Sequence, residues 1–232
     1  MSILIALIIV CGIVASWLWY RAWHDDNANS GRKEKALALI LQQARATADE
    51  TTRALETSGT TDVDVLTEVV WRRTEAPLIT YDTSRREFTA AVAKSTLYDE
   101  EAILPGAGPV KVTRCFVFSY IHRTGQAWTS QLSERHDDVC RPSTDIGGKV
   151  SLALTQISNM YAEDLSRAGI QKGLDPTGRR VYDVKSVVTK GQAVTAFVLV
   201  SSFEGAADQC YRFTRPLGDD GKGSAAVPAS SC

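Results

Sequence analysis

The most distinctive pattern in the chain is the uninterrupted apolar run near its start. Residues 3 to 20 carry no formal charge and are nearly all Ile, Leu, Val, Ala or Trp. As a helix rising 1.5 Å per residue, this run would be roughly 27 Å long, close to the hydrocarbon thickness of a bilayer. Aromatic residues suited to the headgroup region gather at its downstream end: Trp17, Trp19, Tyr20 and Trp23. We therefore assign residues 1–23 to a transmembrane anchor.

A cleaved signal peptide is the alternative interpretation of this run. Such a signal has a basic start, an apolar stretch of about 7 to 15 residues and a small-residue cleavage site. The chain instead opens with Met1 and Ser2, and its apolar run is longer. Ala28 and Ser30 offer a small-x-small site, but they lie beyond several charged residues. The pattern favours an anchor that is retained.

The pattern changes to amphipathic helix after a short polar stretch. Residues 24–31 contain Asp, Asn, Ser and Gly and are predicted to be a juxtamembrane linker. Apolar residues then recur at helical spacing, which predicts a helix over about residues 32–57, ended by Ser58 and Gly59. Residues 61–73 fit two structures. Thr61 with Asp64 favours a short capped helix, whereas the valines favour a strand.

The pattern of the remaining chain predicts strands that are interrupted by one helix. Periodicity of two and intervening Gly and Pro predict strands at 79–81, 87–98, 110–122 and 126–132, and later near 180–189, 193–203 and 210–215. An amphipathic helix is predicted at about 149–168, closed by Gly169. Lys190 and Gly191 predict a turn. Residues 218–231 are rich in Gly, Ser, Ala and Asp and would form a loose loop if Cys232 did not hold them.

Two parts of the chain resemble each other. Residues 88–97 align with 194–203, and a Tyr-Asp pair precedes each segment. Downstream, Cys115 and Cys210 each begin a Cys-aromatic-x-Phe-hydroxyl pattern, and one further cysteine follows each, Cys140 and Cys232. Duplication of one unit explains this similarity, although two unrelated amphipathic strands also look alike, because both alternate with a period of two.

The spacing of the cysteines predicts two disulfides in an oxidising compartment. The chain has no Cys-x-x-Cys motif, and its four cysteines outside the apolar run fall into two similarly spaced pairs. Four cysteines allow three connectivities, and the repeat selects Cys115 with Cys140 and Cys210 with Cys232. Each bridge would close a loop of a little over twenty residues and contribute about 3 kcal/mol by the chain-entropy relation. Cys11 would stay unpaired.

These elements predict an α+β fold. A transmembrane helix is followed by two similar units, residues 32–148 and 149–232, each an amphipathic helix packed on an antiparallel sheet. The sequence leaves open whether the units form one domain or two. Two features disagree on orientation. Basic residues after the apolar run favour a cytoplasmic domain, whereas the paired cysteines favour an extracytoplasmic one. We give the cysteines more weight and predict a single-pass membrane protein whose C-terminal domain lies outside the cytoplasm.

The one cluster of varied titratable residues is 134–138, with His122 nearby across an expected hairpin. His122, His136 and one aspartate could in principle bind a divalent metal. A charged run of this kind is usually a solvated loop, and consecutive residues do not converge on one point without special backbone geometry. We therefore predict no metal site and no cofactor.

The sequence lacks the common catalytic and nucleotide-binding motifs. It has no Gly-x-Ser-x-Gly, no glycine-rich phosphate loop and no His-Glu-x-x-His. Its net charge of −1, with arginine doublets scattered along the chain, argues against a nucleic-acid partner. The sequence therefore predicts a non-catalytic binding or scaffolding domain with a protein or cell-envelope partner. The alternative is a cell-envelope enzyme with a site near His122 and His136.

Overall fold

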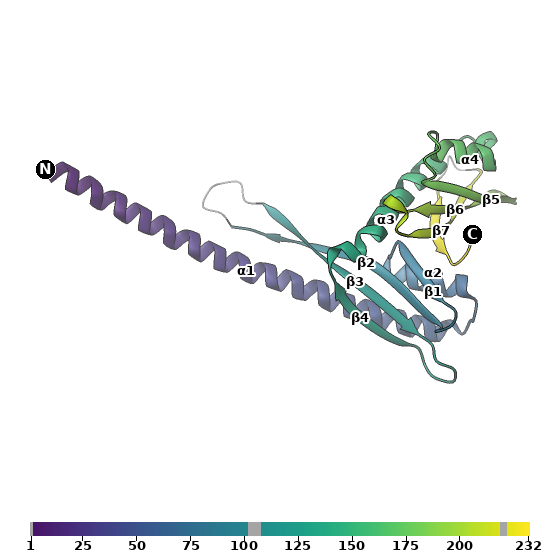
Figure 1. Ribbon diagram of the computed structural model, residues 1–232, viewed down its shortest axis with the longest axis horizontal. Coiled ribbons are helices and arrows are strands. Elements are labelled where there is room, and N and C mark those ends of the chain that lie inside the picture. Colours follow the sequence, from purple (N-terminus) through teal and green to yellow (C-terminus); the bar gives the residue numbers. More distant parts are fainter. Residues whose placement is uncertain (1, 102–107, 219–221) are drawn as a thin grey trace. The chain divides into compact units, whose positions relative to one another are not determined.

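The computed structural model describes residues 2–101, 108–218 and 222–232 and shows an α+β protein (Figure 1). The described α-helices are α1 (Ser2–Ser58), α2 (Val63–Thr74), α3 (Asp137–Ser158) and α4 (Arg167–Leu174). Short 3-10 helices are η1 (Ala162–Asp164) and η2 (Phe203–Gly205). The strands are β1 (Leu78–Asp82), β2 (Glu87–Asp99), β3 (Pro109–Ile121), β4 (Thr129–Arg135), β5 (Tyr182–Lys190), β6 (Ala193–Ser201), β7 (Asp208–Pro216) and β8 (Ala225–Ala229).

The strands form two four-stranded sheets, each with neighbours in chain order, β1-β2-β3-β4 and β5-β6-β7-β8. The pairs are antiparallel, as expected when short turns join consecutive strands. The similar sequence segments occupy equivalent places. Residues 88–97 lie in the second strand of the first sheet, and 194–203 begin in the second strand of the other. Cys115 and Cys210 lie in the two third strands.

The chain divides into two compact units that differ from the sequence repeats. The smaller unit contains residues 1–43 and 94–114, and the larger unit contains 44–93 and 115–232. The larger unit holds residues of both sheets.

In the smaller unit, two side chains of α1 bind Glu101, which follows β2. Asn29 Nδ2 donates to the carbonyl of Glu101 at 2.7 Å, and the Glu101 N–H donates to Asn29 Oδ1 at 2.9 Å. The Arg32 guanidinium pairs with the Glu101 carboxylate. The Asn29 amide therefore bonds both backbone polar groups of Glu101, two residues beyond the end of β2, and Arg32 adds a charge pair.

The polar stretch at 24–31 is helical, and the prediction of a non-helical linker there was wrong. The α1 helix runs without a break from Ser2 to Ser58. Asn, Ser and one Gly disfavour a helix by no more than about 1 kcal/mol each, and the segment has no proline. Because flanking helical residues already supply the nucleus, these small penalties do not stop the helix.

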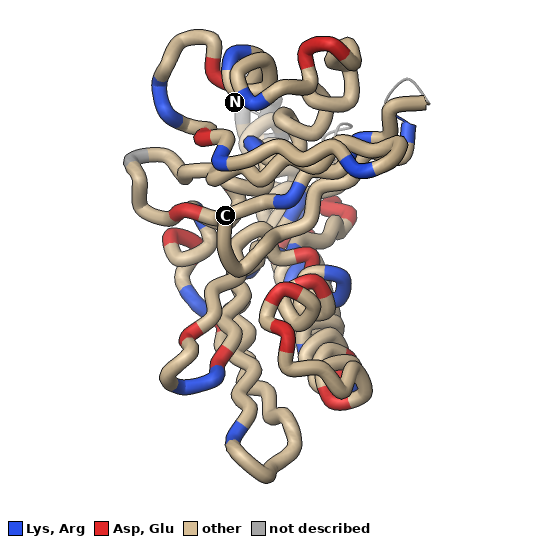
Figure 2. The backbone as a smooth tube through the Cα atoms, turned by 90° about the vertical axis from the view of Figure 1, so that its right-hand side faces the viewer, with Lys and Arg blue, Asp and Glu red and all other residues tan. Residues whose placement is uncertain are grey.

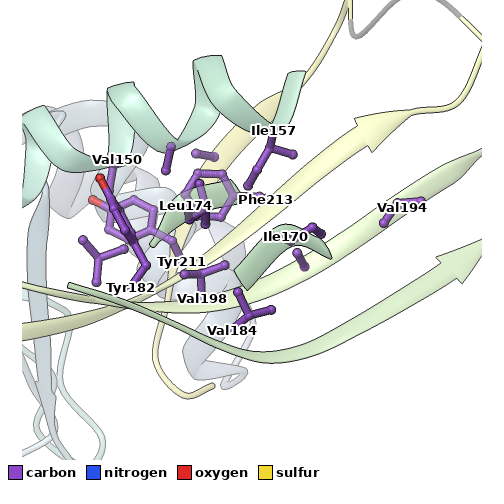
Figure 3. Packing of buried hydrophobic residues seen from close by; sticks show 14 of the residues in the cluster. Val150, Ile157, Ile170, Leu174, Tyr182, Val184, Val194, Val198, Tyr211 and Phe213 are labelled. Atoms are coloured by element: carbon purple, nitrogen blue, oxygen red, sulfur yellow. The ribbon is translucent and has the colours of Figure 1, made fainter. Parts of the chain in front are cut away.

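The main core of the larger unit joins α3 and α4 to the second sheet (Figure 3). Figure 3 shows Val150 and Ile157 of α3 and Leu174 of α4 directed towards Tyr211 and Phe213 of β7. β6 alternates buried and half-buried positions along its length, the pattern of a strand covered more fully on one face. Burial of such side chains is worth about 1.5 to 3 kcal/mol each.

The helix expected at 149–168 differs in position from α3. The α3 helix starts at Asp137 and ends at Ser158, and η1 and α4 follow. The early start includes Pro142, Gly147 and Gly148, residue types that disfavour the interior of a helix. Gly147 has a packing role, because a Cβ there would lie 2.8 Å from Cγ of Pro77. Gly169, expected to stop a helix, lies inside α4, where a Cβ would meet the Asp164 carbonyl oxygen at 2.1 Å.

Two other segments have more structure than the sequence pattern indicated. Residues 63–74 form α2, so the helical alternative holds there, but the N-cap is Asp62 and not Thr61: the Asp62 carboxylate accepts from the N–H of Asp64 and Val65. In the tail, residues 225–229 form β8, paired with β7, and Asp64 accepts from both N and Oγ of Ser230, at 2.8 and 2.6 Å. Residues 219–221 of the tail lie outside the described residues.

The structure contains two disulfides, with the same pairing that the sequence predicts. Cys115 is joined to Cys140, and Cys210 to Cys232. Each links the third strand of a sheet to the residues just after the fourth strand. Cys115 and Cys140 are buried, with Ala91 beside them, whereas Cys232 is exposed. Cys11 is a free, exposed cysteine.

Candidate ligand-binding pocket

The two histidines singled out in the sequence do not share a site. In the β3–β4 ladder, Ile121 pairs with Thr129 and Cys115 with Arg135. His122 and His136 therefore follow opposite ends of this ladder, about 20 Å apart at 3.3 Å per residue. Among the described residues, no group of three or more His, Cys, Asp or Glu is arranged to hold a metal ion.

The 134–138 cluster is not the loop that the sequence indicated. Glu134 and Arg135 end β4, His136 is the N-cap of α3, and Asp137 and Asp138 form its first turn. Acidic side chains there complement the positive end of the helix dipole. The exposed His136 ring contacts Asp138 Oδ2 at 3.0 Å, and Arg141 donates to Asp138 Oδ1 at 2.6 Å. The cluster starts a helix and forms surface pairs.

His122 instead lines a pocket of about 240 Å³. We call this cavity the Trp128 pocket; its lining residues are Thr60, Thr61, Leu66, Tyr81, Arg86, His122 and Trp128. They come from the α1–α2 loop, the first turns of α2, the end of β1, the β1–β2 turn and the β3–β4 turn, all parts of the larger unit.

The β1–β2 turn sets the position of Arg86. Asp82 Oδ1 accepts from the N–H of Ser84 and Arg85 and from the Ser84 hydroxyl, which closes an Asx turn. The hydroxyl of Ser84 is the largest of the contacts that lower the pKa of Asp82. Arg86 follows with a φ of 50°, a left-handed conformation uncommon for a residue with a side chain. Its carbonyl accepts from the His122 N–H at 3.1 Å, which ties this turn to the end of β3.

The β3–β4 turn places Trp128 beside His122. Gln126 N donates to the Arg123 carbonyl at 3.0 Å, and Gly125, third in this turn, has a φ of 74°. A positive φ at that position alone is the geometry of a type II turn and favours glycine. The backbone N–H of Trp128 then donates to Glu56 Oε2 of α1 at 3.0 Å. Both ends of the turn are therefore fixed to neighbouring elements.

The pocket has an aromatic wall. The His122 and Trp128 rings stack, with centroids 4.8 Å apart and planes inclined by 17°. The Trp128 ring also lies 6.0 Å from the buried Phe88, which in turn lies 4.5 Å from Tyr81, its partner across β1 and β2. Such contacts contribute about 0.5 to 1.5 kcal/mol beyond area burial. His122, Trp128 and Tyr81 stay half-buried, so part of each ring faces the pocket.

The charge of the lining is positive. Arg86 is exposed and donates from Nη1 to Thr124 Oγ1 at 3.2 Å. The seven lining residues include no carboxylate. Among the acidic residues close to them in the chain or bonded to them, Asp82 accepts within its own turn, Asp62 caps α2, and Glu56 accepts from the backbone N–H of Trp128. Elsewhere along the backbone, acidic and basic residues are interspersed (Figure 2). The guanidinium therefore faces the pocket without a carboxylate of the lining to neutralise it.

Two other hollows of the larger unit lack this combination. One, of about 510 Å³, is lined by Glu50, Arg53, Ala54, Thr57 and Arg73 and has no aromatic wall. Another, of about 310 Å³, runs along β1 and the C-terminal residues, and its lining includes Tyr81 but no basic residue. The Trp128 pocket combines stacking surfaces, hydroxyls and a cation, which are groups that bind and orient a small molecule.

Comparison of the chain with protein-family models, with curated proteins and with solved structures gave no match.

Proposed function

We propose that the chain is a single-pass membrane protein, anchored through residues 3–20, whose folded C-terminal part lies outside the cytoplasm and binds a ligand or envelope partner without catalysis. The observation that carries the proposal is an apolar helical segment exposed on all sides in a chain that also contains two disulfides.

The exposed apolar surface of α1 supports the anchor. Leu7 is 62 % exposed, Ile13 64 % and Trp19 75 %. The helix is long and apolar enough to cross a membrane, and its most apolar stretch is not buried. Apolar area left in water costs about 25 cal/mol per Å², and a helix that is apolar on all faces needs an apolar surrounding. A signal sequence near the N-terminus has the same features, so retention needs a direct test.

The disulfides support the orientation. Structural disulfides persist in oxidising compartments and are rare in the cytosol. Arg21 and the later basic residues oppose this orientation through the positive-inside bias. A folded domain with a buried bridge such as Cys115–Cys140 needs an oxidant, whereas the charge bias is a preference. We therefore give the disulfides more weight than the flanking charges in proposing the orientation.

We also propose that each sheet is covered by the helix that precedes it. For the second sheet, the core of α3, α4 and strands β5 to β8 supports this packing. For the first, α1 has buried residues at helical spacing, Ala44, Ala48, Thr51 and Leu55, and Glu56 of the same helix accepts from Trp128 N at 3.0 Å. The element order, long helix, short helix and four strands, then occurs twice, as duplication of one unit would give.

The binding role rests on the Trp128 pocket. The enzyme alternative relied on His122 together with His136, and these residues lie at opposite ends of a strand pair. His122 remains in a pocket with aromatic and basic neighbours, which suits recognition.

Membrane extraction of the full chain, followed by intact mass measurement, tests the proposal. We expect the chain to stay in the membrane pellet after alkaline carbonate treatment and to retain its N-terminal segment, with the full 25.3 kDa mass. A control variant with Leu7→Lys, Val10→Lys and Ile13→Lys should become extractable, since each charge at the centre of a spanning helix costs about 2.5 to 3.5 kcal/mol. A native chain that is soluble, or that begins near residue 31, would overturn the anchor.

A further inference from the structure

We infer that the Trp128 pocket binds a six-membered ring carrying a carboxylate, with the ring against the aromatic wall and the carboxylate on Arg86. This inference deepens the proposed binding function and rests on it. The shared chemistry has two sources, an acidic sugar residue of an envelope glycan and an aromatic carboxylic acid.

The aromatic wall selects a flat, weakly polar face. Stacking on His122 orients the Trp128 ring, and Tyr81 brings a third ring to the lining. Both the C–H face of a sugar ring and an aromatic ring pack well against such surfaces. The volume of about 240 Å³ lies just below the roughly 300 to 1,000 Å³ of typical ligand pockets. It therefore suits one ring, such as a single sugar residue, and is too small for a long apolar chain.

Arg86 selects a carboxylate. A guanidinium offers five N–H donors in a planar fork that matches the two oxygens of a carboxylate. One Nη1 hydrogen bond of Arg86 goes to the Thr124 hydroxyl, which orients the fork. The lining contains no carboxylate, so an anionic ligand meets no like charge among these seven residues. Hydroxyls of Thr60 and Thr61 can serve the neutral polar groups of a ligand.

The pocket is organised before any ligand binds. The Arg86 backbone carbonyl accepts from the His122 N–H at 3.1 Å, and the Trp128 backbone N–H donates to Glu56 at 3.0 Å, so the backbone that carries both side chains is fixed. Tyr81 lies on β1, in register with Phe88, and the buried Leu66 of α2 also lines the cavity. Little conformational entropy is then lost on binding, which matters for a small ligand with few contacts.

Fluorine NMR of the full chain in detergent micelles, with 5-fluorotryptophan in place of tryptophan, tests the inference. The Trp128 signal is assigned by its loss in Trp128→Phe, and the Trp71 signal serves as an internal reference. The probes are glucuronate for the sugar source and 4-hydroxybenzoate for the aromatic source. Glucose, a ring without charge, and acetate, a charge without a ring, are the matched controls.

We expect a saturable shift of the Trp128 signal with glucuronate or with 4-hydroxybenzoate, and the probe that binds identifies the source. Glucose and acetate should each bind at least roughly tenfold more weakly than the acid that binds, because each lacks one of the two contacts. Arg86→Gln should weaken binding by at least roughly tenfold, since it removes a charged hydrogen-bond donor. Arg123→Gln, an exposed arginine outside the pocket lining, should bind like the native chain.

The inference is overturned if neither acid shifts the Trp128 signal, if glucose or acetate binds as tightly as the acid that binds, or if Arg86→Gln binds that acid as well as Arg123→Gln. Unchanged signals of the other tryptophans show that each variant is folded. None of these results depends on the location of the chain in the cell. Failure of this inference is therefore distinguishable from failure of the anchor, which membrane extraction tests separately.

Discussion

The backbone N–H of Ile79 donates to Oε1 of Gln209 at 2.9 Å. Ile79 lies in β1 and Gln209 in β7, so one side-chain amide joins the two sheets within the larger unit. Gln209 Nε2 also donates to the Ala229 carbonyl at 2.9 Å, and only 4 % of the residue is exposed. Gln209 therefore satisfies polar backbone groups from β1 and β8 that would otherwise be buried without partners.

Replacing Gln209 by Leu should lower the free energy of unfolding by about 1 to 3 kcal/mol, because the Ile79 N–H loses its partner while it stays buried. Denaturant unfolding followed by circular dichroism gives this value. Gln192→Leu, in the exposed β5–β6 turn, is the control and should change stability by less than about 0.5 kcal/mol. Equal effects of the two substitutions would show that the contact between the sheets contributes nothing.

Arg215 of β7 should stabilise the end of α3. Its Nη2 donates to the Met160 carbonyl at 2.7 Å and its Nε to the Ser158 carbonyl at 3.4 Å, and only 6 % of the residue is exposed. A cation at a helix C-terminus satisfies free carbonyls and complements the dipole. Arg215→Met should therefore cost about 1 to 3 kcal/mol in denaturant unfolding.

Arg212 on the same strand is the matched control for Arg215. It pairs with Glu68 Oε2 at 2.9 Å, but its side chain is 39 % exposed. Solvent screens such a pair, so Arg212→Met should cost only about 0 to 1 kcal/mol. The account of Arg215 fails if the two substitutions destabilise the protein equally.

The two disulfides should differ in their effect on stability. Chain entropy predicts about 3 kcal/mol for each, because the sequence separations of 25 and 22 are similar. Replacing Cys115 and Cys140 by Ala also empties part of a buried cluster, whereas Cys232 is exposed at the chain end. We expect the Cys115/Cys140 replacement to lower the unfolding midpoint in denaturant more than the Cys210/Cys232 replacement. The reverse order would contradict this assignment of roles.

Asp82 should make the β1–β2 turn sensitive to acid. Hydrogen bonds, first from the Ser84 hydroxyl, lower its pKa below the ordinary value of 3.8. The folded state therefore stabilises the ionised form of Asp82 relative to the unfolded state. The resulting stability is present above pH 3.8 and is lost as the pH falls through the lower folded-state pKa. The difference in melting temperature between the native chain and Asp82→Ala should thus shrink below pH 3.8. A constant difference from pH 7 to pH 2 would show that ionisation has no part in it.

The sequence pattern located the elements whose signal is local. Strands β2, β3, β6 and β7 alternate clearly, and their predicted ranges agree with the structure to within a few residues. The start of α3 was missed because Pro142, Gly147 and Gly148 are helix breakers in isolation. Gly147 is present there because α3 approaches Pro77, a contact that only the tertiary structure reveals. β8 was missed for a similar reason, because its small residues pair with β7 without an alternating apolar pattern of their own.

The pocket could be predicted only in part. His122 was identified as a candidate from its chemistry, but its partners were not. Arg86 belongs to one of the scattered arginine doublets, to which no binding role was given, and Trp128 was placed inside the strand predicted at 126–132. Only the register of β1 with β2 and of β3 with β4 brings the turns that carry them together. The available signal was an arginine at one turn, Arg86, and an aromatic residue at another, Trp128. It indicates a pocket only once the strand pairing shows that the two turns lie together.

The most direct test of the central claim is labelling of an introduced cysteine with a membrane-impermeant maleimide. Lys190→Cys places a thiol at the exposed end of β5, and four native cysteines are held in disulfides. Cys11, in the apolar segment, is replaced by Ala so that the new thiol is not confused with it. If the folded part lies outside the cytoplasm, position 190 is labelled in intact cells to the same extent as after lysis. Labelling that occurs only after lysis would place it in the cytoplasm and contradict the account.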